Sequence, residues 1–235
     1  LLERVAEINE NIAVVLFSGR PLDLRDVQVK AKAILEVWMP GTEGAGAITD
    51  VLYGRYNPTG KLPMSFPYCV GQVPVHYNEY ATGRPHVEGK DKDRFRSKYL
   101  DIPNAPLYPF GYGLSYTTFT VSEVSLDKDS MKDGESIRAA VTVKNTGTCA
   151  GTETIQLYLH DVAASVVRPV KELKDFRKVT LQPGEETSVE FTITEPQLRF
   201  LSENHIFESE AGVFEVFIGT DSTTANKAKF TLEKQ

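Results

Sequence analysis

The chain has 235 residues, of which 41% are hydrophobic and 25% charged, with a net charge of −6 at neutral pH; these values are ordinary for a globular protein of one large or two small domains. The negative charge disfavours a binder of nucleic acid or of anionic membranes, since both need a basic face, and no apolar run approaches the roughly 20 residues of a membrane-spanning helix. Cys69 and Cys149 stand in unrelated contexts and predict two free thiols rather than a disulfide framework.

The first part of the chain alternates helix and strand patterns. Leu1–Ile8 has helical spacing without a capping residue before it, so we expect a helix already under way in a piece of a longer protein. Asn11–Gly19 and Ala33–Met39 are continuous apolar runs, typical of strands buried on both faces of a parallel sheet, with a short helical patch between them. A further helix is expected from about Ala45, and Gly54 lies where a left-handed cap is wanted. This order predicts a partial α/β sandwich, the C-terminal half of a doubly wound-like sheet.

Residues 56–107 show little periodicity. The stretch 56–67 is rich in turn formers, and the stretch 78–101 is long and polar. A structureless segment of this length is usually functional or packed over a neighbouring domain. Its aromatic content also argues against a simple flexible linker.

From residue 117 onward the hydrophobic period falls to two, which is typical of half-buried strands. Turn-forming residues separate the runs at 132–134, 145–147, 183–184 and 210–212. With strands also expected near 119–126 and 176–181, about seven strands predict an antiparallel β-sandwich of the immunoglobulin or fibronectin type III kind. No Cys…Trp…Cys pattern is present, which disfavours a true antibody domain. The alternating apolar runs are Ile137–Val143, Ile155–Leu159, Val189–Ile193, Phe214–Ile218 and Ala228–Leu232.

Leu107–Phe119, with the sequence LYPFGYGLSYTTF, joins the two parts. Its glycines let the backbone turn where a Cβ would clash, and Pro109 fixes one φ angle. Its aromatic rings are suited to filling a crevice between domains. We therefore expect a stiff joint, with the β-sandwich docked rather than free to swing.

The strongest enzyme-like pattern is Met39–Gly46, MPGTEGAG, between a predicted strand and a predicted helix. Ligands bind at this edge of open α/β sheets, and helix N-termini attract anions. Neither nucleotide-binding motif fits, because G-x-x-x-x-G-K-S/T is absent and Thr49 stands where a dinucleotide fingerprint has Gly or Ala. Glu43 is explained by capping or by the helix dipole, and substrate binding is the sharper alternative.

Arg20 follows the other buried run, in FSGRPLDL, and is expected at the same edge. It is a candidate substrate contact, with a structural salt bridge or loop anchor as the simpler explanation. Arg94, Arg96, Lys98 and Tyr99 form a further cluster that is typical of a solvated loop. The hydrolase, zinc-protease and EF-hand motifs are absent, and the histidines have no metal partner at ligand spacing. The residues alone therefore assemble no active site and imply no metal or cofactor.

Four stretches resemble the C-terminal region of glycoside hydrolase family 3, in particular bacterial β-glucosidases of the periplasmic type. They are residues 38–67, 74–85, 96–119 and 168–185. The combination of G-x-x-N-P-x-G-K-L-P with L-Y-P-F-G-Y-G-L-S-Y-T-x-F is highly specific. The resemblance extends over essentially the whole chain.

This resemblance implies a three-domain enzyme: an N-terminal barrel with the aspartate nucleophile, an α/β sandwich that supplies the acid/base glutamate in many members, and a fibronectin type III-like domain. Residues 1–68 would be the C-terminal half of the α/β sandwich, 69–116 an irregular, aromatic-rich connecting segment, and 117–235 the fibronectin type III-like domain. Both catalytic carboxylates are expected upstream, so no residue of this chain is expected to be catalytic, and Glu43 is not the family's acid/base.

The function expected from the resemblance is that of the C-terminal portion of a retaining β-glucosidase, inactive alone, that acts on terminal β-D-glucosyl residues of oligosaccharides or aryl glucosides. Its expected partners are the barrel of the same protein and the β-glucoside substrate, without nucleic acid, membrane or cofactor. Half a sheet exposes an edge and an apolar face, so the isolated chain is expected to form a homodimer or exchange elements. The expected compartment is the periplasm or cytoplasm of a bacterium.

Two other classes of function stay open. A carbohydrate-binding or adhesion module built on a fibronectin-like sandwich would display exposed aromatic residues. Tyr158 is the clearest outward-facing strand aromatic in the pattern, while Trp38 stands in a buried-strand pattern. A flavodoxin-like small-molecule binder is a third interpretation, weakened by the truncated sheet and the unmatched glycine motifs.

Overall fold

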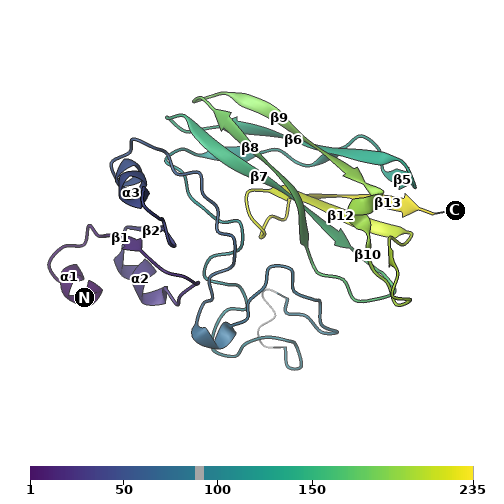
Figure 1. The fold of residues 1–235 in the computed structure, drawn as a ribbon. Coiled ribbons are helices and arrows are strands. Elements are labelled where there is room, and N and C mark those ends of the chain that lie inside the picture. Colours follow the sequence, from purple (N-terminus) through teal and green to yellow (C-terminus); the bar gives the residue numbers. More distant parts are fainter. Residues whose placement is uncertain (88–92, 235) are drawn as a thin grey trace.

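The computed structural model describes residues 1–87 and 93–234, and Figure 1 shows their arrangement. The strands β1 and β2 of the N-terminal α/β part pair in parallel, and Leu16 lies opposite Glu36 at their carboxyl ends. Gly54 follows the last helix with a φ of +71°, the left-handed conformation that the sequence predicted. The predicted order of elements is confirmed. The elements are α1 Leu2–Ala6, β1 Ala13–Leu16, α2 Arg25–Lys30, β2 Ala33–Glu36 and α3 Gly44–Leu52.

The two parallel strands are shorter and less buried than the apolar runs 11–19 and 33–39 predicted. Each has four residues, one exposed and three half-buried. A strand is covered on both faces only where other strands and helices pack around it, and in the described residues this sheet consists of β1 and β2 alone. Trp38 was expected inside the second buried strand, but it lies beyond the strand's end with a φ of +51°.

Between α3 and β3 the chain is irregular but packed, with only the short η1 Val70–Gln72 among its described residues. Residues 53–118 are called the connecting segment from here on, a longer stretch than the 69–116 expected from the sequence. Its two ends run side by side between the α/β part and the β-sandwich (Figure 1). Phe66 N–H donates to Tyr108 O at 2.8 Å, Leu62 N–H to Tyr112 O at 2.8 Å, and Gly111 N–H to Leu62 O at 2.8 Å. We call residues 62–66 and 107–112 the ladder, because these bonds join them as two strands are joined.

The β-sandwich has one sheet in the order β5-β13-β12-β7-β8 and a second in which β6 pairs with β3, β4 and β9. Pairing is antiparallel except between β5 and β13. The expected strand 119–126 is divided into β3 and β4, since Val124 N–H bonds to the Asn226 side chain rather than to β6. The strands are β3 Phe119–Val121, β4 Ser125–Leu126, β5 Ser130–Lys132, β6 Ser136–Asn145, β7 Gly151–Asp161, β8 Glu172–Leu181, β9 Glu186–Thr194, β12 Gly212–Gly219 and β13 Lys227–Glu233. The helix η2 Glu195–Leu198 and the hairpin of β10 Phe200–Leu201 and β11 Phe207–Glu208 complete the domain.

The core between the two sheets consists of the alternating side chains that the period of two predicted. Members from all five apolar runs are buried in one cluster, including Ile137, Ile155, Phe191 and Phe214. Two of the glycines in the predicted turns have a left-handed backbone, with a φ of +83° at Gly134 and +80° at Gly184. Local periodicity is enough to assign these faces, because it fixes which side of a strand each residue occupies.

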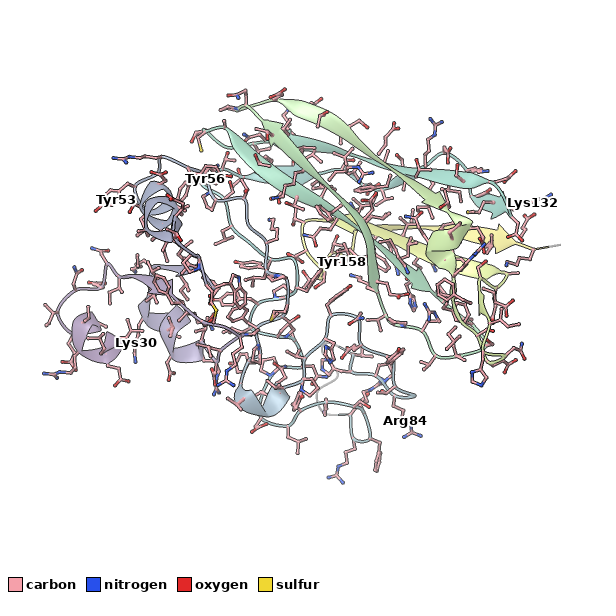
Figure 2. All side chains as sticks on the ribbon, in the orientation of Figure 1. Lys30, Tyr53, Tyr56, Arg84, Lys132 and Tyr158 are labelled. Atoms are coloured by element: carbon pink, nitrogen blue, oxygen red, sulfur yellow. The ribbon has the colours of Figure 1, made fainter. Side chains whose placement is uncertain are left out.

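Strand β7 departs from this alternation in burial, and the prediction that Tyr158 is an exposed, outward-facing aromatic is wrong. Tyr158 is 0% exposed, and most of β7 is buried on both faces. The outer face of the five-stranded sheet is not solvent-exposed at this strand, because the connecting segment packs against it. Figure 2 shows Tyr158 on the side of the sandwich that faces this segment.

Candidate functional site

The carboxyl ends of β1 and β2 form the candidate site in this chain. Because the strands are parallel and in register, the loops after Leu16 and Glu36 emerge side by side. Together they line a shallow groove of about 400 Å³. This is the edge of a parallel sheet at which α/β proteins bind ligands. The lining residues are Phe17, Ser18, Gly19, Trp38, Met39, Pro40 and Gly41.

Glu36 links the two loops. Its carboxylate accepts the Trp38 backbone N–H at 2.8 Å and lies 3.2 Å from Ser18 Oγ through each oxygen. Ser18 Oγ is also 3.0 Å from Arg20 O. The half-buried carboxylate therefore fixes the relative position of the loop after β1 and the loop after β2.

The Trp38 ring packs against the connecting segment. Its centroid lies 5.8 Å from that of Phe66, with the planes tilted by 51°. Phe66 is buried and also meets Tyr108 edge-on at 6.2 Å. A contact chain of aromatic rings therefore runs from the groove into the ladder.

Arg20 and Glu43 lie beside this groove in the sequence but not in its lining. Both are exposed, and the Arg20 guanidinium makes no hydrogen bond or ion pair within residues 1–87 and 93–234. Glu43 is the N-cap residue of α3, but its side chain makes no capping hydrogen bond. Neither the salt bridge considered for Arg20 nor side-chain capping by Glu43 is present in the described part, and their substrate-binding role stays a prediction.

Aromatic rings fill the joint between the connecting segment and the β-sandwich, as the sequence predicted. Tyr77 stacks on Phe110 with centroids 4.2 Å apart and meets Tyr158 edge-on at 5.9 Å. Tyr108 and Tyr112 stack at 5.5 Å. Rings contribute large contact areas with few rotatable bonds, so this surface is suited to hold the two parts in one orientation.

Gln156 fastens the joint by hydrogen bonds. Its side-chain nitrogen donates to Gly111 O at 3.2 Å and to Thr220 O at 2.6 Å, and its oxygen accepts the Tyr158 hydroxyl. Gly111 has a φ of +80°, and a Cβ there would collide with the Gln156 amide. A glycine is therefore required at this position for two separate reasons.

A buried ion pair crosses the same joint. Lys61 Nζ lies 2.7 Å from Glu153 Oε1, with side chains only 14% and 9% exposed. Lys61 also donates to Gly113 O at 2.8 Å. The pair joins the start of the connecting segment to β7, so the β-sandwich is attached to the segment by charge as well as by rings.

Lys171 holds the loop between β12 and β13 against the joint. Its ammonium donates to Ser222 O at 2.9 Å and to Thr224 O, and lies 4.4 Å from the centre of the Phe217 ring. The Ser222 N–H in turn donates to Phe110 O at 3.0 Å. Burial lowers the pKa of Lys171 to about 8, outweighing the opposite effect of the Asp221 charge.

The lowered pKa of Lys171 predicts that stability rises in alkaline solution. Between pH 8 and about 10.4, the usual lysine pKa, the unfolded chain holds a proton that the folded chain has released. The free energy of unfolding of the wild type should therefore increase over this window relative to a Lys171→Met variant. Urea unfolding at several pH values measures the difference, with Lys178→Met at an exposed position of β8 as the control for loss of a charge. A difference independent of pH would contradict the prediction.

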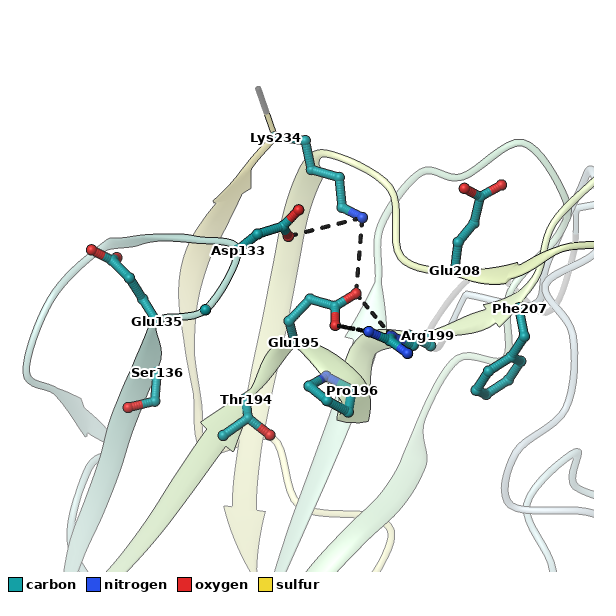
Figure 3. A pocket seen from close by; sticks show the side chains of 11 residues that line it. Asp133, Glu135, Ser136, Thr194, Glu195, Pro196, Arg199, Phe207, Glu208 and Lys234 are labelled. Atoms are coloured by element: carbon teal, nitrogen blue, oxygen red, sulfur yellow. Dashed lines mark hydrogen bonds and ion pairs between the residues drawn. The ribbon is translucent and has the colours of Figure 1, made fainter.

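A second groove, of about 730 Å³, lies at the far end of the β-sandwich (Figure 3). Glu195 is buried at its centre. Its carboxylate accepts a hydrogen bond from Arg199 Nε at 2.9 Å, and Lys234 Nζ lies 3.8 Å from it. The hydrogen bond from Arg199 holds the pKa of Glu195 below its usual value, more than burial raises it. A carboxylate stabilised in its charged form by these partners forms a structural ion pair and is not suited to donate a proton.

Other sequence candidates fall on the surface. Arg94 and Tyr99 are exposed, and Arg96 pairs with the adjacent Asp93 at 2.9 Å, as expected of a solvated loop. Both cysteines are free thiols, as predicted. In the part of the chain that the structure describes, no three His, Cys, Asp or Glu side chains gather as a metal site. In the same residues, every helix is too short or too polar to cross a membrane.

The roles of Glu36 and Asn57 were missed by the sequence reasoning. The Asn57 side chain donates to Ala150 O at 2.9 Å and accepts from Ser115 Oγ and the Tyr116 N–H at 2.9 and 2.8 Å. Asn57 belongs to one quoted motif, and Ser115 and Tyr116 belong to the other. The two motifs could therefore have indicated the role of Asn57, because its hydrogen bonds join one motif to the other.

Two family descriptions match the sequence: the glycosyl hydrolase family 3 C-terminal domain over residues 1–116, and the fibronectin type III-like domain over residues 153–222. A periplasmic beta-glucosidase of Salmonella typhimurium is 49% identical over 232 residues, covering 99% of this chain. A putative beta-xylosidase of Formosa agariphila is 36% identical over 234 residues. A crystal structure of beta-glucosidase from Listeria innocua in complex with glucose superposes with a TM-score of 0.94 at 44% identity, covering 98% of this chain.

The matched proteins are much longer than this chain. It spans 30% of the Salmonella and Formosa relatives and 32% of the Listeria chain. The likeness therefore concerns one portion of each of these proteins.

Proposed function

Because the chain belongs to glycoside hydrolase family 3, as a C-terminal region of such an enzyme, we propose that it is part of a longer β-glucosidase. The longer protein would hydrolyse terminal β-D-glucosyl residues of oligosaccharides or aryl glucosides with retention of configuration. The observation that carries the proposal is the identity along nearly the whole chain to a protein named a β-glucosidase. The Formosa relative, named a putative β-xylosidase, makes a xyloside the competing substrate.

The proposed chemistry lies outside this chain. A retaining glycosidase needs two carboxyl groups about 5–5.5 Å apart, one as nucleophile and one as acid/base. We place both upstream, the nucleophile on an N-terminal barrel. The residue ranges 1–68, 69–116 and 117–235 are proposed as half of the α/β domain, an irregular aromatic-rich connection and the fibronectin-like domain. In this scheme Arg20 and Glu43 are weak candidates for substrate contacts at the sheet edge.

The proposal predicts that activity depends on the upstream part. The 235-residue chain should release p-nitrophenol from p-nitrophenyl β-D-glucoside only at the background rate, because it lacks both carboxyl groups. The longer protein should cleave the same substrate, and the anomer released first should have the β configuration. Cleavage by the short chain at the rate of the longer protein would overturn the assignment. A longer protein that cleaves the β-xyloside and not the β-glucoside would replace glucose by xylose in it.

The apolar surface of the α/β part supports an intramolecular partner. Large apolar side chains are exposed on α1, on α2, and in the loops after β1 and β2, including Ile8, Phe17, Val29 and Met39. Large exposed apolar side chains that gather on one part of a protein mark an interface. We propose that the upstream barrel and the rest of the α/β domain cover the apolar side chains on α1 and α2 in the longer protein and leave the groove lined by Phe17 and Met39 open.

An uncovered face of this kind should make the isolated chain associate. Size-exclusion chromatography with light scattering should give the mass of a homodimer or a larger species, and association should weaken when Val29 and Met39 are both replaced by glutamate. The paired replacement of exposed Glu123 and Glu190 on the β-sandwich by lysine is the control. A monomer with a cooperative thermal transition would count against this partner proposal.

We propose the periplasm as the compartment, with the cytoplasm as the alternative. Support comes from the name of the Salmonella relative, a periplasmic beta-glucosidase. Fractionation of the source bacterium with activity staining distinguishes the two compartments.

A further inference from the structure

The loop after β2 holds a tryptophan in a backbone conformation that costs energy. Trp38 has a φ of +51°, in the left-handed region, which is strained for a residue other than glycine. Such conformations persist only where the surroundings impose them, and they cluster at active sites and ligand clamps. The contacts that impose this one are therefore informative about function.

Glu36 holds the conformation of Trp38 through the Trp38 backbone N–H. It accepts the Trp38 N–H at 2.8 Å, which closes a tight turn immediately after the strand. It also interacts with Ser18 in the neighbouring loop at 3.2 Å. Within the described residues Glu36 has no cationic partner. Holding these two loops is therefore the role that its contacts give to this half-buried carboxylate.

Phe66 supports the ring from the other side. It is buried in the connecting segment, and its ring centre lies 5.8 Å from that of Trp38. The half-buried indole thus lies between a fixed support and the groove, which it lines together with Phe17 and Met39. The groove lining is mostly apolar, so it suits a flat, weakly polar ring rather than an ion.

We propose that Trp38 contacts the substrate of the longer enzyme and that Glu36 is the positioning residue that presents it; this inference rests on the proposed function. The ligand chemistry that fits is a six-membered ring with an apolar face, since aromatic side chains pack well against such faces. In a β-glucoside this ring is either an aryl leaving group or a pyranose, and two substrates separate these sources.

The test uses the longer protein labelled with 5-fluorotryptophan. The Trp38 fluorine resonance is identified by its loss in Trp38→Phe. Michaelis constants are measured with p-nitrophenyl β-D-glucoside and with a β-linked glucose disaccharide, for Glu36→Ala, Glu36→Gln, Trp38→Ala and the double variant. Glu190→Ala, at an exposed position of β9, is the control.

The expected result is that Glu36→Ala shifts the Trp38 resonance and raises KM about tenfold, which corresponds to about 1.4 kcal/mol. Glu36→Gln should restore most of the affinity, because the amide oxygen accepts the same Trp38 N–H. Trp38→Ala should raise KM at least as much, and the double variant should be no worse, since Glu36 acts through Trp38. If Trp38→Ala does not fold, Trp38→Phe gives the same test with a smaller rise.

Each contrary outcome contradicts a different part of the proposal. A resonance unmoved by Glu36→Ala, or losses that add up in the double variant, would overturn the positioning role. An unchanged KM in Trp38→Ala would overturn the proposed contact between Trp38 and the substrate. A rise in KM with only one substrate identifies which ring packs on Trp38. If the wild-type longer protein cleaves neither substrate, the proposed function has failed, while the fluorine resonance still decides whether Glu36 positions Trp38.

Discussion

Replacing Glu153 by alanine is expected to lower the free energy of unfolding by about 3–5 kcal/mol, as found when one partner of a buried ion pair is removed. The variant removes the ion-pair partner of Lys61, whose side chain is only 14% exposed, and leaves the Gly113 carbonyl as the partner of the ammonium. Urea unfolding followed by circular dichroism measures the change. Because the pair crosses from β7 to the connecting segment, the loss should also loosen the joint.

The double variant Lys61→Met, Glu153→Leu separates pairing from desolvation. Removing both charges relieves the cost of burying them, so this variant should recover most of the stability lost by Glu153→Ala. Glu186→Ala, which removes an exposed pair with Lys144 at 3.3 Å, should cost no more than about 1 kcal/mol. Equal losses for Glu153→Ala and Glu186→Ala would show that the buried pair does not stabilise the joint.

The β-sandwich was predictable because its evidence is local. The face that Ile155 or Phe214 occupies follows from alternation with its neighbours in the chain, and both residues are in the core. The left-handed turn at Gly134 was equally local, since Lys132-Asp133-Gly134 is a turn sequence wherever it occurs. The order of elements in the α/β part followed for the same reason.

Tyr158 is a residue whose burial could not be predicted from local alternation. Its alternation with Leu157 and Leu159 correctly placed it on the outer face of its sheet. What covers that face is the connecting segment, in which Tyr77 meets Tyr158 and stacks on Phe110. No periodicity within β7 reports a contact with so distant a part of the chain. An aromatic residue taken as a mark of a carbohydrate-binding surface is therefore part of an internal joint, which removes the main residue favouring that interpretation.

The groove was only half predictable. The rule about the carboxyl ends of parallel strands directed attention to the loops containing Arg20 and Met39, and residues of these two loops line the groove. The position of Trp38 was missed because an apolar run does not show where a strand stops pairing, and β2 ends at Glu36. That ending depends on a side-chain carboxylate capturing a backbone N–H two residues later, an event of tertiary geometry.

Replacing Phe66 by alanine is expected to cost about 3–5 kcal/mol, the usual loss for a buried phenylalanine. Phe66 is 1% exposed and lies between the Trp38 and Tyr108 rings, so the cavity would open under the groove. The chain contains a single tryptophan, and its fluorescence therefore reports on Trp38 alone. Emission of the folded variant should shift to longer wavelength, because water reaches the indole face that Phe66 covers.

Two matched variants decide whether this loss reflects support of the groove. Phe66→Leu keeps most of the volume and should cost less than about 1.5 kcal/mol, with a smaller spectral shift. Phe207→Ala removes a ring that is 64% exposed and should change stability by no more than about 0.5 kcal/mol, leaving the emission unchanged. If Phe66→Ala destabilises the chain but leaves the emission at its wild-type wavelength, the indole does not depend on Phe66, and the left-handed conformation of Trp38 must then be held by Glu36 alone.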